Sequence, residues 1–274
     1  MIKQIIHLSD LHVKNYQLHD LFRTQLTKFI DDVARRLDGY EHNEIRIVIT
    51  GDIVDQKINI SNEQVVLLSW FFYELSKIGV IIVLPGNHDF LINNQERVDS
   101  LSPIINLLNK GQRNANGKEY IKYLKDRGVV EDENVKWVVY SLYEDNKRPE
   151  FEKGDGFYVG LFHGQIQGMS TDLGFSFDNG YDKLNFLDLD LVLCGDIHKR
   201  QVFETPNKRK GYMIGSLIQL EHGETIKHHG YGMYDVENDK YDFVDIESEQ
   251  PFMHFKITDI TDIEDGKETL LNLG

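Results

Sequence analysis

Five short polar clusters each follow an apolar run in this sequence. They contain carboxylates, imidazoles and one amide, and they read Asp10-Leu11-His12, Gly51-Asp52, Gly86-Asn87-His88-Asp89, His163-Gly164 and Gly195-Asp196-Ile197-His198. None of the clusters contains a cysteine, and such a mixed nitrogen and oxygen set suits Mn, Fe or Zn better than calcium or an iron–sulfur cluster. The clusters therefore indicate a metal site.

The spacing within the clusters indicates more than one ion. In an extended chain, residues two apart point to the same side, so Asp10 with His12, and Asp196 with His198, can each present two ligands together. The candidate ligands are Asp10, His12, Asp52, Asn87, His163, Asp196 and His198. This is too many for one tetrahedral ion, but it fits two ions about 3.5 to 4 Å apart that share a carboxylate, for which Asp52 is the natural choice. Three carboxylates against two divalent ions leave a net positive site, which suits a phosphate.

The elements that position these side chains alternate between strand and helix. Apolar runs rich in Ile and Val predict strands over residues 2–8, 45–50, 79–84, 135–142, 157–162 and 189–194. Helical spacing predicts helices over 18–37, 61–77 (capped by Ser61 or Asn62) and 101–108, with loops over 111–117 and 144–155. From residue 201 onward, short runs between turn residues predict an antiparallel sheet. In open α/β sheets ligands gather at the carboxyl ends of strands, so the five clusters can converge on one crevice.

Composition limits the class of protein. The chain has 274 residues, of which 41% are hydrophobic, and its formal net charge is −15. This predicts one large domain, or one domain with a smaller appendage. The single cysteine, Cys194, excludes an intrachain disulfide, and no apolar run is long enough for a membrane span, so we expect a soluble, cytoplasmic protein. An acidic chain does not hold nucleic acid by phosphate neutralisation alone, so bound cations or a partner must supply the attraction.

The motif series resembles that of the calcineurin-like metallophosphoesterases. Asp-x-His, Gly-Asp, Gly-Asn-His-Asp, a strand-terminal His and Gly-x-x-His occur here in that family's order. A closer resemblance is to the SbcD nucleases, the prokaryotic and viral counterparts of the eukaryotic Mre-eleven DNA-repair nuclease. It rests on residues 97–101, on 195–201 and on the Gly-Ser-x-x-Gln, Gly-Glu and Gly-Tyr series within 212–236, and it covers roughly residues 1–260.

The resemblance implies an α/β fold, a four-layer αββα sandwich over residues 1–245, with 246–274 as the start of a capping region that is truncated here or unusually short. It implies that one metal takes Asp10, His12, Asp52 and His198, and that the other takes Asp52, Asn87, His163 and Asp196. His88 matches the catalytic histidine, which protonates the leaving oxygen or stabilises charge on the phosphate, while a hydroxide between the ions attacks. Asp196 stands where many members have a histidine, and a carboxylate favours harder ions such as Mn.

The function implied by the resemblance is a Mn-dependent DNA exonuclease and endonuclease of repair or recombination that works with an SbcC-type ATPase. We expect double-stranded ends and single-stranded DNA as substrates, no membrane, and a location in the cytoplasm, or in the host cytoplasm if the protein is viral. Mg, Fe and Zn remain alternatives to Mn as the two divalent ions. Family members dimerise through helices near 65–75, with 101–108 as a second candidate, although core burial explains the same apolar stripe equally well. A small-molecule phosphodiesterase or phosphatase is the alternative function, and a scaffold without metal is a third.

Other polar residues receive no role in the site. Asp89 is interpreted as a loop carboxylate that binds backbone amides, and Cys194 and His7 as structural residues. Asp55 is given no function. We favour a solvated hairpin over a second metal cluster for His222, His228 and His229, and a solvated turn over a DNA contact for residues 208–210.

Overall fold

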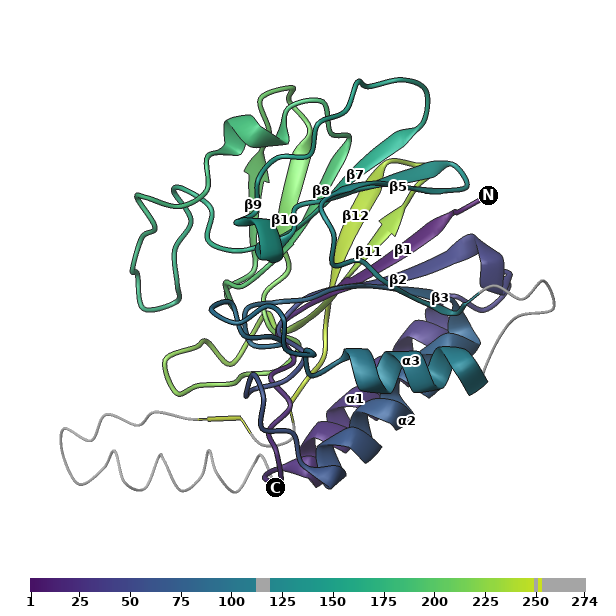
Figure 1. Ribbon diagram of the computed structural model, residues 1–274, viewed down its shortest axis with the longest axis vertical. Coiled ribbons are helices and arrows are strands. Elements are labelled where there is room, and N and C mark those ends of the chain that lie inside the picture. The colour runs from purple at the N-terminus through teal and green to yellow at the C-terminus, as the bar shows by residue number, and fades with distance from the viewer. Residues whose placement is uncertain (112–118, 249–250, 253–274) are drawn as a thin grey trace, which may run out of the picture.

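The computed structural model describes residues 1–111, 119–248 and 251–252. The strands of this part of the chain form two six-stranded sheets, in the orders β12-β11-β1-β2-β3-β4 and β5-β6-β7-β8-β10-β9 (Figure 1). The first sheet consists of β1 (Gln4–Leu8), β2 (Ile45–Thr50), β3 (Val80–Leu84), β4 (Ile121–Tyr123), β11 (Gly230–Asp235) and β12 (Lys240–Asp245). The second consists of β5 (Gly128–Asp132), β6 (Val135–Val139), β7 (Phe157–His163), β8 (Leu191–Gly195), β9 (Gln201–Glu204) and β10 (Lys210–Met213).

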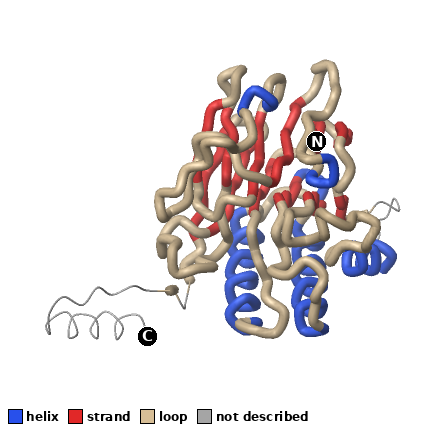
Figure 2. Tube along the Cα trace, turned by 60° about the vertical axis from the view of Figure 1, so that its left-hand side comes forward, coloured by secondary structure: helices blue, strands red, loops and turns tan. Residues whose placement is uncertain are grey.

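Helices cover the outer face of the first sheet. The described α-helices are α1 (His19–Arg36), α2 (Asn62–Ile78) and α3 (Ser102–Gly111), and the 3-10 helices are η1 (His42–Glu44), η2 (Leu142–Glu144) and η3 (Lys183–Phe186). Figure 2 shows the long helices together on one side of the strands. Ser61 is the N-cap of α2, where its hydroxyl accepts a hydrogen bond from the Gln64 amide at 3.1 Å.

The strand residues alternate between two apolar layers. In β2, Ile47 and Ile49 pack against the helices, whereas Val48 faces the second sheet and meets the layer that contains Trp137 and Leu161. A third apolar cluster, which includes Phe186 of η3, covers the outer face of the second sheet. Both faces of the central strands are thus buried, which explains why most of their residues are apolar. The predicted α/β two-sheet sandwich is confirmed.

The main error of the sequence-based prediction concerns the strands after residue 201. They form no single antiparallel sheet, because β9 and β10 pair at the edge of the second sheet while β11 and β12 pair at the edge of the first. Strand β10 also runs parallel to β8. Alternating side chains identify a hairpin but not the sheet edge that it joins. The strand predicted over 135–142 ends at Val139, β4 and β5 were not predicted, and the loop predicted over 111–117 lies almost entirely outside the described residues.

A buried ion pair links the two sheets. Arg46 of β2 donates from Nε and Nη2 to the two carboxylate oxygens of Asp132 in β5, at 2.7 and 2.9 Å. The indole of Trp137 donates to the same carboxylate at 3.0 Å, and the Lys122 ammonium lies 2.7 Å from it. Because both carboxylate oxygens are held by donors, the charge of Asp132 is compensated inside the sandwich.

The domain limits predicted from the sequence remain a prediction. Strand β12 ends at Asp245, and most of 246–274 lies outside the described residues. Among the helices that the structure describes, none combines the length and the apolar character needed to span a membrane.

Candidate metal centre

All eight predicted site residues lie at or just beyond the carboxyl ends of five strands. Asp10 and His12 follow β1, Asp52 follows β2, Asn87 and His88 follow β3, His163 ends β7, and Asp196 and His198 follow β8. Strands β1, β2 and β3 run parallel in one sheet, and β7 and β8 run parallel in the other. Since the two sheets face each other, these ends meet in one place. The structure therefore brings the eight residues together.

Sharp backbone turns aim several of these side chains. Asp10, His12, Asp52 and Asp196 have φ values of 52°, 44°, 52° and 98°, a left-handed conformation that side chains other than glycine rarely adopt. The prediction that Asp10 and His12 share one side of an extended chain is thus right in its outcome but wrong in its cause, because a turn brings the two side chains together. A hydrogen bond to the loop after β2 holds this turn, because the His12 amide donates to the Asp52 carbonyl at 3.0 Å.

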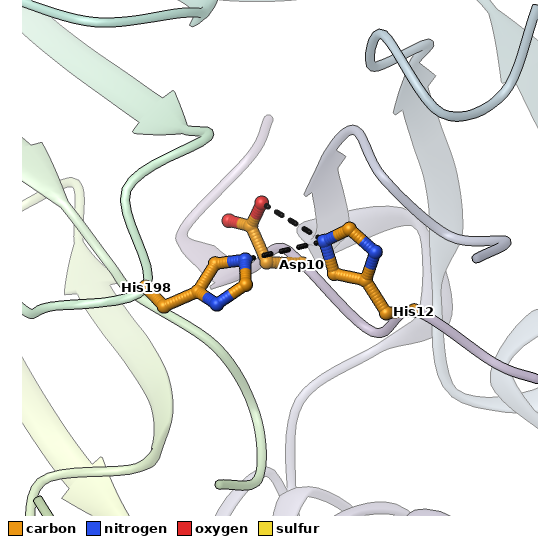
Figure 3. Close-up of side chains that lie close together, drawn as sticks. All are labelled: Asp10, His12 and His198. Atoms are coloured by element: carbon orange, nitrogen blue, oxygen red, sulfur yellow. Dashed lines mark hydrogen bonds and ion pairs between the residues drawn. The ribbon is translucent and has the colours of Figure 1, made fainter. Parts of the chain in front are cut away.

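One group of ligand atoms surrounds His12. Its Nε2 lies 3.2 Å from Nε2 of His198, 3.5 Å from Oδ2 of Asp52 and 4.0 Å from Oδ1 of Asp10. Figure 3 shows the side chains of Asp10, His12 and His198 pointing toward one another. One ligand atom from each of these three residues lies within 4.8 Å of the other two. This geometry is suitable for a single ion.

A second group surrounds His163, which is fully buried. Its Nε2 lies 3.1 Å from Oδ1 of Asn87, 3.3 Å from Oδ1 of Asp52 and 3.7 Å from Oδ1 of Asp196. Asp52 therefore turns Oδ2 toward His12 and Oδ1 toward His163. A carboxylate placed between two imidazoles in this way can bridge two ions.

Hydrogen bonds fix the orientation of three imidazoles. Nδ1 of His163 donates to the carbonyl of Thr50 at 2.6 Å, and Nδ1 of His88 donates to the carbonyl of Asp55 at 2.8 Å. Nδ1 of His198 lies 2.7 Å from Oε1 of Glu224. Because these acceptors carry no proton, Nδ1 is the donor in each ring, and Nε2 is left to face the centre.

Glu224 orients His198 through this hydrogen bond, a role that was not predicted from the sequence. It belonged only to the Gly-Glu motif of the family resemblance, 26 positions after His198. Its other oxygen accepts a hydrogen bond from the Leu220 amide at 2.8 Å, which holds the carboxylate in place. Burial lowers the pKa of His198, but the hydrogen bond to Glu224 and nearby carboxylates outweigh it and raise that pKa to about 9.

Burial and charge perturb the other groups as well. Burial raises the pKa of Asp10 to about 6 and lowers the pKa of His12 to about 3. Burial also opposes the charge of Asp52, but His163 outweighs it and holds the pKa of this carboxyl below its ordinary value. In turn, the carboxylates of Asp52 and Asp196 overcome burial and raise the pKa of His163. Protonated imidazoles thus balance the negative charge of the buried carboxylates. Divalent cations bound by the same residues can balance that charge instead.

The donor set fits divalent ions. Nε2 of His12 and Nε2 of His198 are 3.2 Å apart, so both cannot carry a proton there, and a cation satisfies the two lone pairs at once. Carboxylate, imidazole and amide ligands are those of mixed nitrogen and oxygen sites. We identify this arrangement as a candidate site for divalent metal.

Asp89 and several other residues have structural roles. Asp89 accepts hydrogen bonds from the amides of Ile53, Val54 and Gly86 at 2.7 to 3.1 Å, as predicted. His7 is buried in β1 and binds the hydroxyls of Thr50 and Tyr241. Cys194 is buried in β8, in agreement with a core role.

The two predictions about surface clusters had different outcomes. His229 is buried and binds the Thr225 carbonyl at 2.7 Å, so it is wrong to place all three histidines of that stretch in a solvated hairpin. In the described parts of the chain, no metal-competent group includes His222, His228 or His229. Lys208 lies in the exposed turn between β9 and β10 and pairs with Glu204, as expected for a solvated turn.

Comparison with known proteins agrees with this centre. The family described as calcineurin-like phosphoesterase matches residues 3–200. The uncharacterized protein R555 of Acanthamoeba polyphaga mimivirus is 30% identical over 271 residues, and the alignment covers 94% of this chain and 19% of that protein. The chain thus spans about a fifth of the length of this relative. Because the stretch matched by the family contains every residue of the candidate metal centre, the chain belongs to the calcineurin-like phosphoesterases.

Proposed function

We propose that this chain is a DNA nuclease of the SbcD type, which cleaves phosphodiester bonds with two divalent ions in repair or recombination. Family membership indicates the coarser activity, metal-dependent hydrolysis of phosphoesters. The observation that carries the two-ion proposal is the orientation of Asp52. Its two oxygens lie 3.5 Å from Nε2 of His12 and 3.3 Å from Nε2 of His163, so one carboxylate serves both groups.

The side chains divide the work of binding. Asp10, His12, Asp52 and His198 would hold one ion, and Asp52, Asn87, His163 and Asp196 the other. When bound, such ions activate water and neutralise charge on the phosphate oxygens. Mn is our first choice, because Asp196 supplies a hard oxygen ligand, with Mg, Fe and Zn as alternatives.

His88 is suited to move a proton. Its Nδ1 is held by the Asp55 carbonyl at 2.8 Å, and its ring stands 4.8 Å from the ring of His12, measured between centroids. Since Nδ1 keeps its proton, Nε2 is the atom that exchanges one, and it can donate to the leaving oxygen. The His88 amide also donates to Oδ1 of Asp52 at 2.8 Å, which fixes the imidazole beside the candidate ligands.

The choice of DNA as substrate is supported by sequence motifs outside the centre. The segment 97–101 contacts the site loop, where the Ser100 amide donates to the Asp89 carbonyl at 2.9 Å. Asp99 accepts hydrogen bonds from the Leu101 and Ser102 amides at the start of α3, at 3.0 and 2.7 Å. This segment therefore has a structural task as well, and the small-molecule phosphodiesterase or phosphatase remains the competing function.

The deciding experiment is digestion of end-labelled duplex and single-stranded DNA with Mn, Mg or EDTA, beside His88→Ala and His42→Ala. His42 lies in η1 before the amino end of β2, away from the site, and serves as the control. We expect cleavage that requires Mn and is lost only in the His88 variant. Hydrolysis of bis(p-nitrophenyl) phosphate or a nucleotide, with DNA intact, would instead assign the small-molecule function.

Partners are part of the same proposal. An SbcC-type ATPase would supply the attraction to DNA ends that a chain of net charge −15 lacks. A homodimer would form through α2 and α3, where Val66, Tyr73 and Leu107 are 66%, 42% and 71% exposed, whereas Leu67, Leu68, Phe71, Phe72 and Leu75 of the apolar stripe pack in the core. Light scattering of the wild type and of Val66→Asp tests the dimer. A wild type that stays monomeric at high concentration would rule it out.

A further inference from the structure

A cavity of about 300 Å³ lies between the two sheets, at the opposite end of the strands from the metal centre. It is bounded by two turns, one from each sheet: 205–209 between β9 and β10, and 236–239 between β11 and β12. The first residue of β8, Leu191, lines this cavity, whereas Asp196 follows the last residue of the same strand at the centre. The five residues of β8, at about 3.3 Å each, therefore separate the two sites.

Three tyrosines line the cavity, Tyr212 of β10, Tyr234 of β11 and Tyr241 of β12. The rings of Tyr212 and Tyr241 stack between the two sheets with their centroids 3.7 Å apart. The hydroxyl of Tyr234 donates to Asp239 at 2.6 Å, and that of Tyr241 lies 2.9 Å from Nδ1 of His7. Tyr212 is only 9% exposed, yet its hydroxyl has no hydrogen-bond partner in the part of the chain that the structure describes. A ligand in the cavity can satisfy this hydroxyl.

A guanidinium is held in place in the wall of the cavity. Arg209 donates from Nε to the Asp190 carbonyl at 2.9 Å, and its Nη1 lies 2.9 Å from the Asp239 carboxylate. Among the described residues, no hydrogen bond or ion pair uses Nη2 of Arg209. The Asp190 carboxylate is paired with Lys153, which lies outside the lining, at 2.7 Å. The structure thus offers a guanidinium whose orientation is set before any anion binds.

The lining carries more positive than negative charge. It contains four cations and two carboxylates, a net charge of +2: Lys208, Arg209, Lys210, Lys240, Asp190 and Asp239. The ammonium of Lys210 has no ion pair within the described ranges, because Glu204, its neighbour on β9, pairs with Lys208 at 3.0 Å. Lys240 pairs with Asp242 at 2.7 Å, but both side chains are exposed, and such pairs contribute little to stability. Lys210 is therefore available to an anion, and Lys240 can turn toward one.

We propose that this cavity binds a small ligand through a phosphate dianion, which accepts hydrogen bonds from Nη2 of Arg209, the ammonium of Lys210 and the hydroxyl of Tyr212. All three groups are donors, and a phosphate dianion offers only acceptor oxygens. A phosphate monoester carries about two negative charges at pH 7, which match the lining, whereas each phosphodiester of a nucleic acid carries one. The volume is at the lower end of the range for small-ligand sites, so a group attached to the phosphate also fits.

The test is calorimetric titration of the Mn-loaded His88→Ala protein, which lacks the candidate proton donor, with inorganic phosphate and with deoxyadenosine monophosphate. Lys210→Ala should weaken binding about 10-fold or more, and Tyr212→Phe, which keeps the stacked ring, about 5-fold. Lys77→Ala is the control, because it removes an equal charge from an exposed position on α2. Similar affinities for the two ligands would assign free phosphate, and tighter binding of the nucleotide would assign a monoester.

The opposing results are distinct. An unchanged Kd in both Lys210→Ala and Tyr212→Phe, or an equal loss in Lys77→Ala, would overturn the phosphate site. A 15-base-pair duplex that loses as much affinity as the nucleotide in Lys210→Ala would assign the cavity to a nucleic-acid backbone and overturn the small ligand. The proposal is independent of the nuclease function, since the cavity contains no candidate metal ligand. A protein that cleaves no DNA but shows the expected binding losses would retain the phosphate site.

Discussion

The hydrogen bond from His198 to Glu224 should set the affinity of one metal ion. Glu224 lies 2.7 Å from Nδ1 of His198 and is itself held by the Leu220 amide at 2.8 Å. Its carboxylate fixes the ring and increases electron density at Nε2, which faces Asp10 and His12 (Figure 3). Replacing Glu224 changes no candidate ligand, so its effect reports on orientation and charge alone.

The expected loss of metal affinity depends on the type of hydrogen bond that His198 retains in each Glu224 variant. Glu224→Gln keeps a neutral acceptor, and a charge-assisted bond exceeds a neutral one by about 1 kcal/mol, which corresponds to a loss of about 5-fold in metal affinity. Glu224→Ala removes the acceptor, and loss of such a partner typically lowers affinity by about 10- to 100-fold. The order wild type, Gln, Ala is therefore the expected ranking.

The assay is competition for Mn with a chromophoric chelator, which resolves the two binding steps. Only the step that involves His198 should weaken, because His163 takes its Nδ1 partner from the Thr50 carbonyl. Glu221→Gln, a nearby exposed carboxylate, is the matched control. Equal affinity of the Gln variant and the wild type, or equal weakening of both steps, would refute the reasoning.

Three further predictions concern stability and metal content. Asp132→Asn should lower the free energy of unfolding by about 3 kcal/mol at pH 7, because buried Arg46 loses the carboxylate that it contacts at 2.7 Å, and Glu133 lies farther away, at 3.9 Å; urea denaturation measures this, and a change under 1 kcal/mol would contradict it. Burial raises the pKa of Asp132, but Arg46 and Lys122 outweigh it and lower the pKa from 3.8 to about 2, so the stabilisation is present above pH 4 and the difference between the two proteins should shrink as the pH falls toward 2. Gly51→Ala should reduce the number of bound ions counted by mass spectrometry, since a Cβ there would lie 2.4 Å from Nδ1 of His163 on a backbone with φ of +96°; a full count of two would oppose this. Removing the metal with EDTA should lower the melting temperature, because each ion at 100 times its Kd contributes about 2.7 kcal/mol, and an unchanged calorimetric transition would count against bound ions.

The position of the centre could be predicted because buried parallel strands leave a clear signal. Strands β1, β2 and β8 are buried at every residue, so each appears as a mainly apolar run, which only a few polar residues such as His7 and Arg46 interrupt and which ends shortly before a cluster of polar side chains. Asp10, Asp52 and Asp196 follow those stops directly or within two residues. Parallel strands place such stops on one edge, and that rule requires no knowledge of the loops between them.

The surroundings of the centre could not be predicted in the same way. The partners of His163 and His88 are backbone carbonyls, those of Thr50 and Asp55, and a carbonyl has no signature in the sequence. Glu224 lies in a loop without periodicity, so only tertiary structure shows that it reaches His198. The sheet to which each of the strands β9 to β12 belongs was missed for a related reason. Which strands pair with one another depends on side chains that are far apart in the sequence.

The strained backbone of four ligand residues shows that contacts elsewhere in the fold maintain the geometry of the site. Asp10, His12, Asp52 and Asp196 hold left-handed conformations, at a cost of about 1 to 3 kcal/mol each, which their own preferences would not select. They are kept there by bonds between strands, such as those from the Asp10 amide to the Gly51 carbonyl at 3.0 Å and from the Asp196 amide to the Asp10 carboxylate at 3.1 Å. The second of these bonds joins the two sheets. Because each loop is held by the next, the arrangement of the ligands depends on the whole sandwich, and a short motif alone would not maintain it.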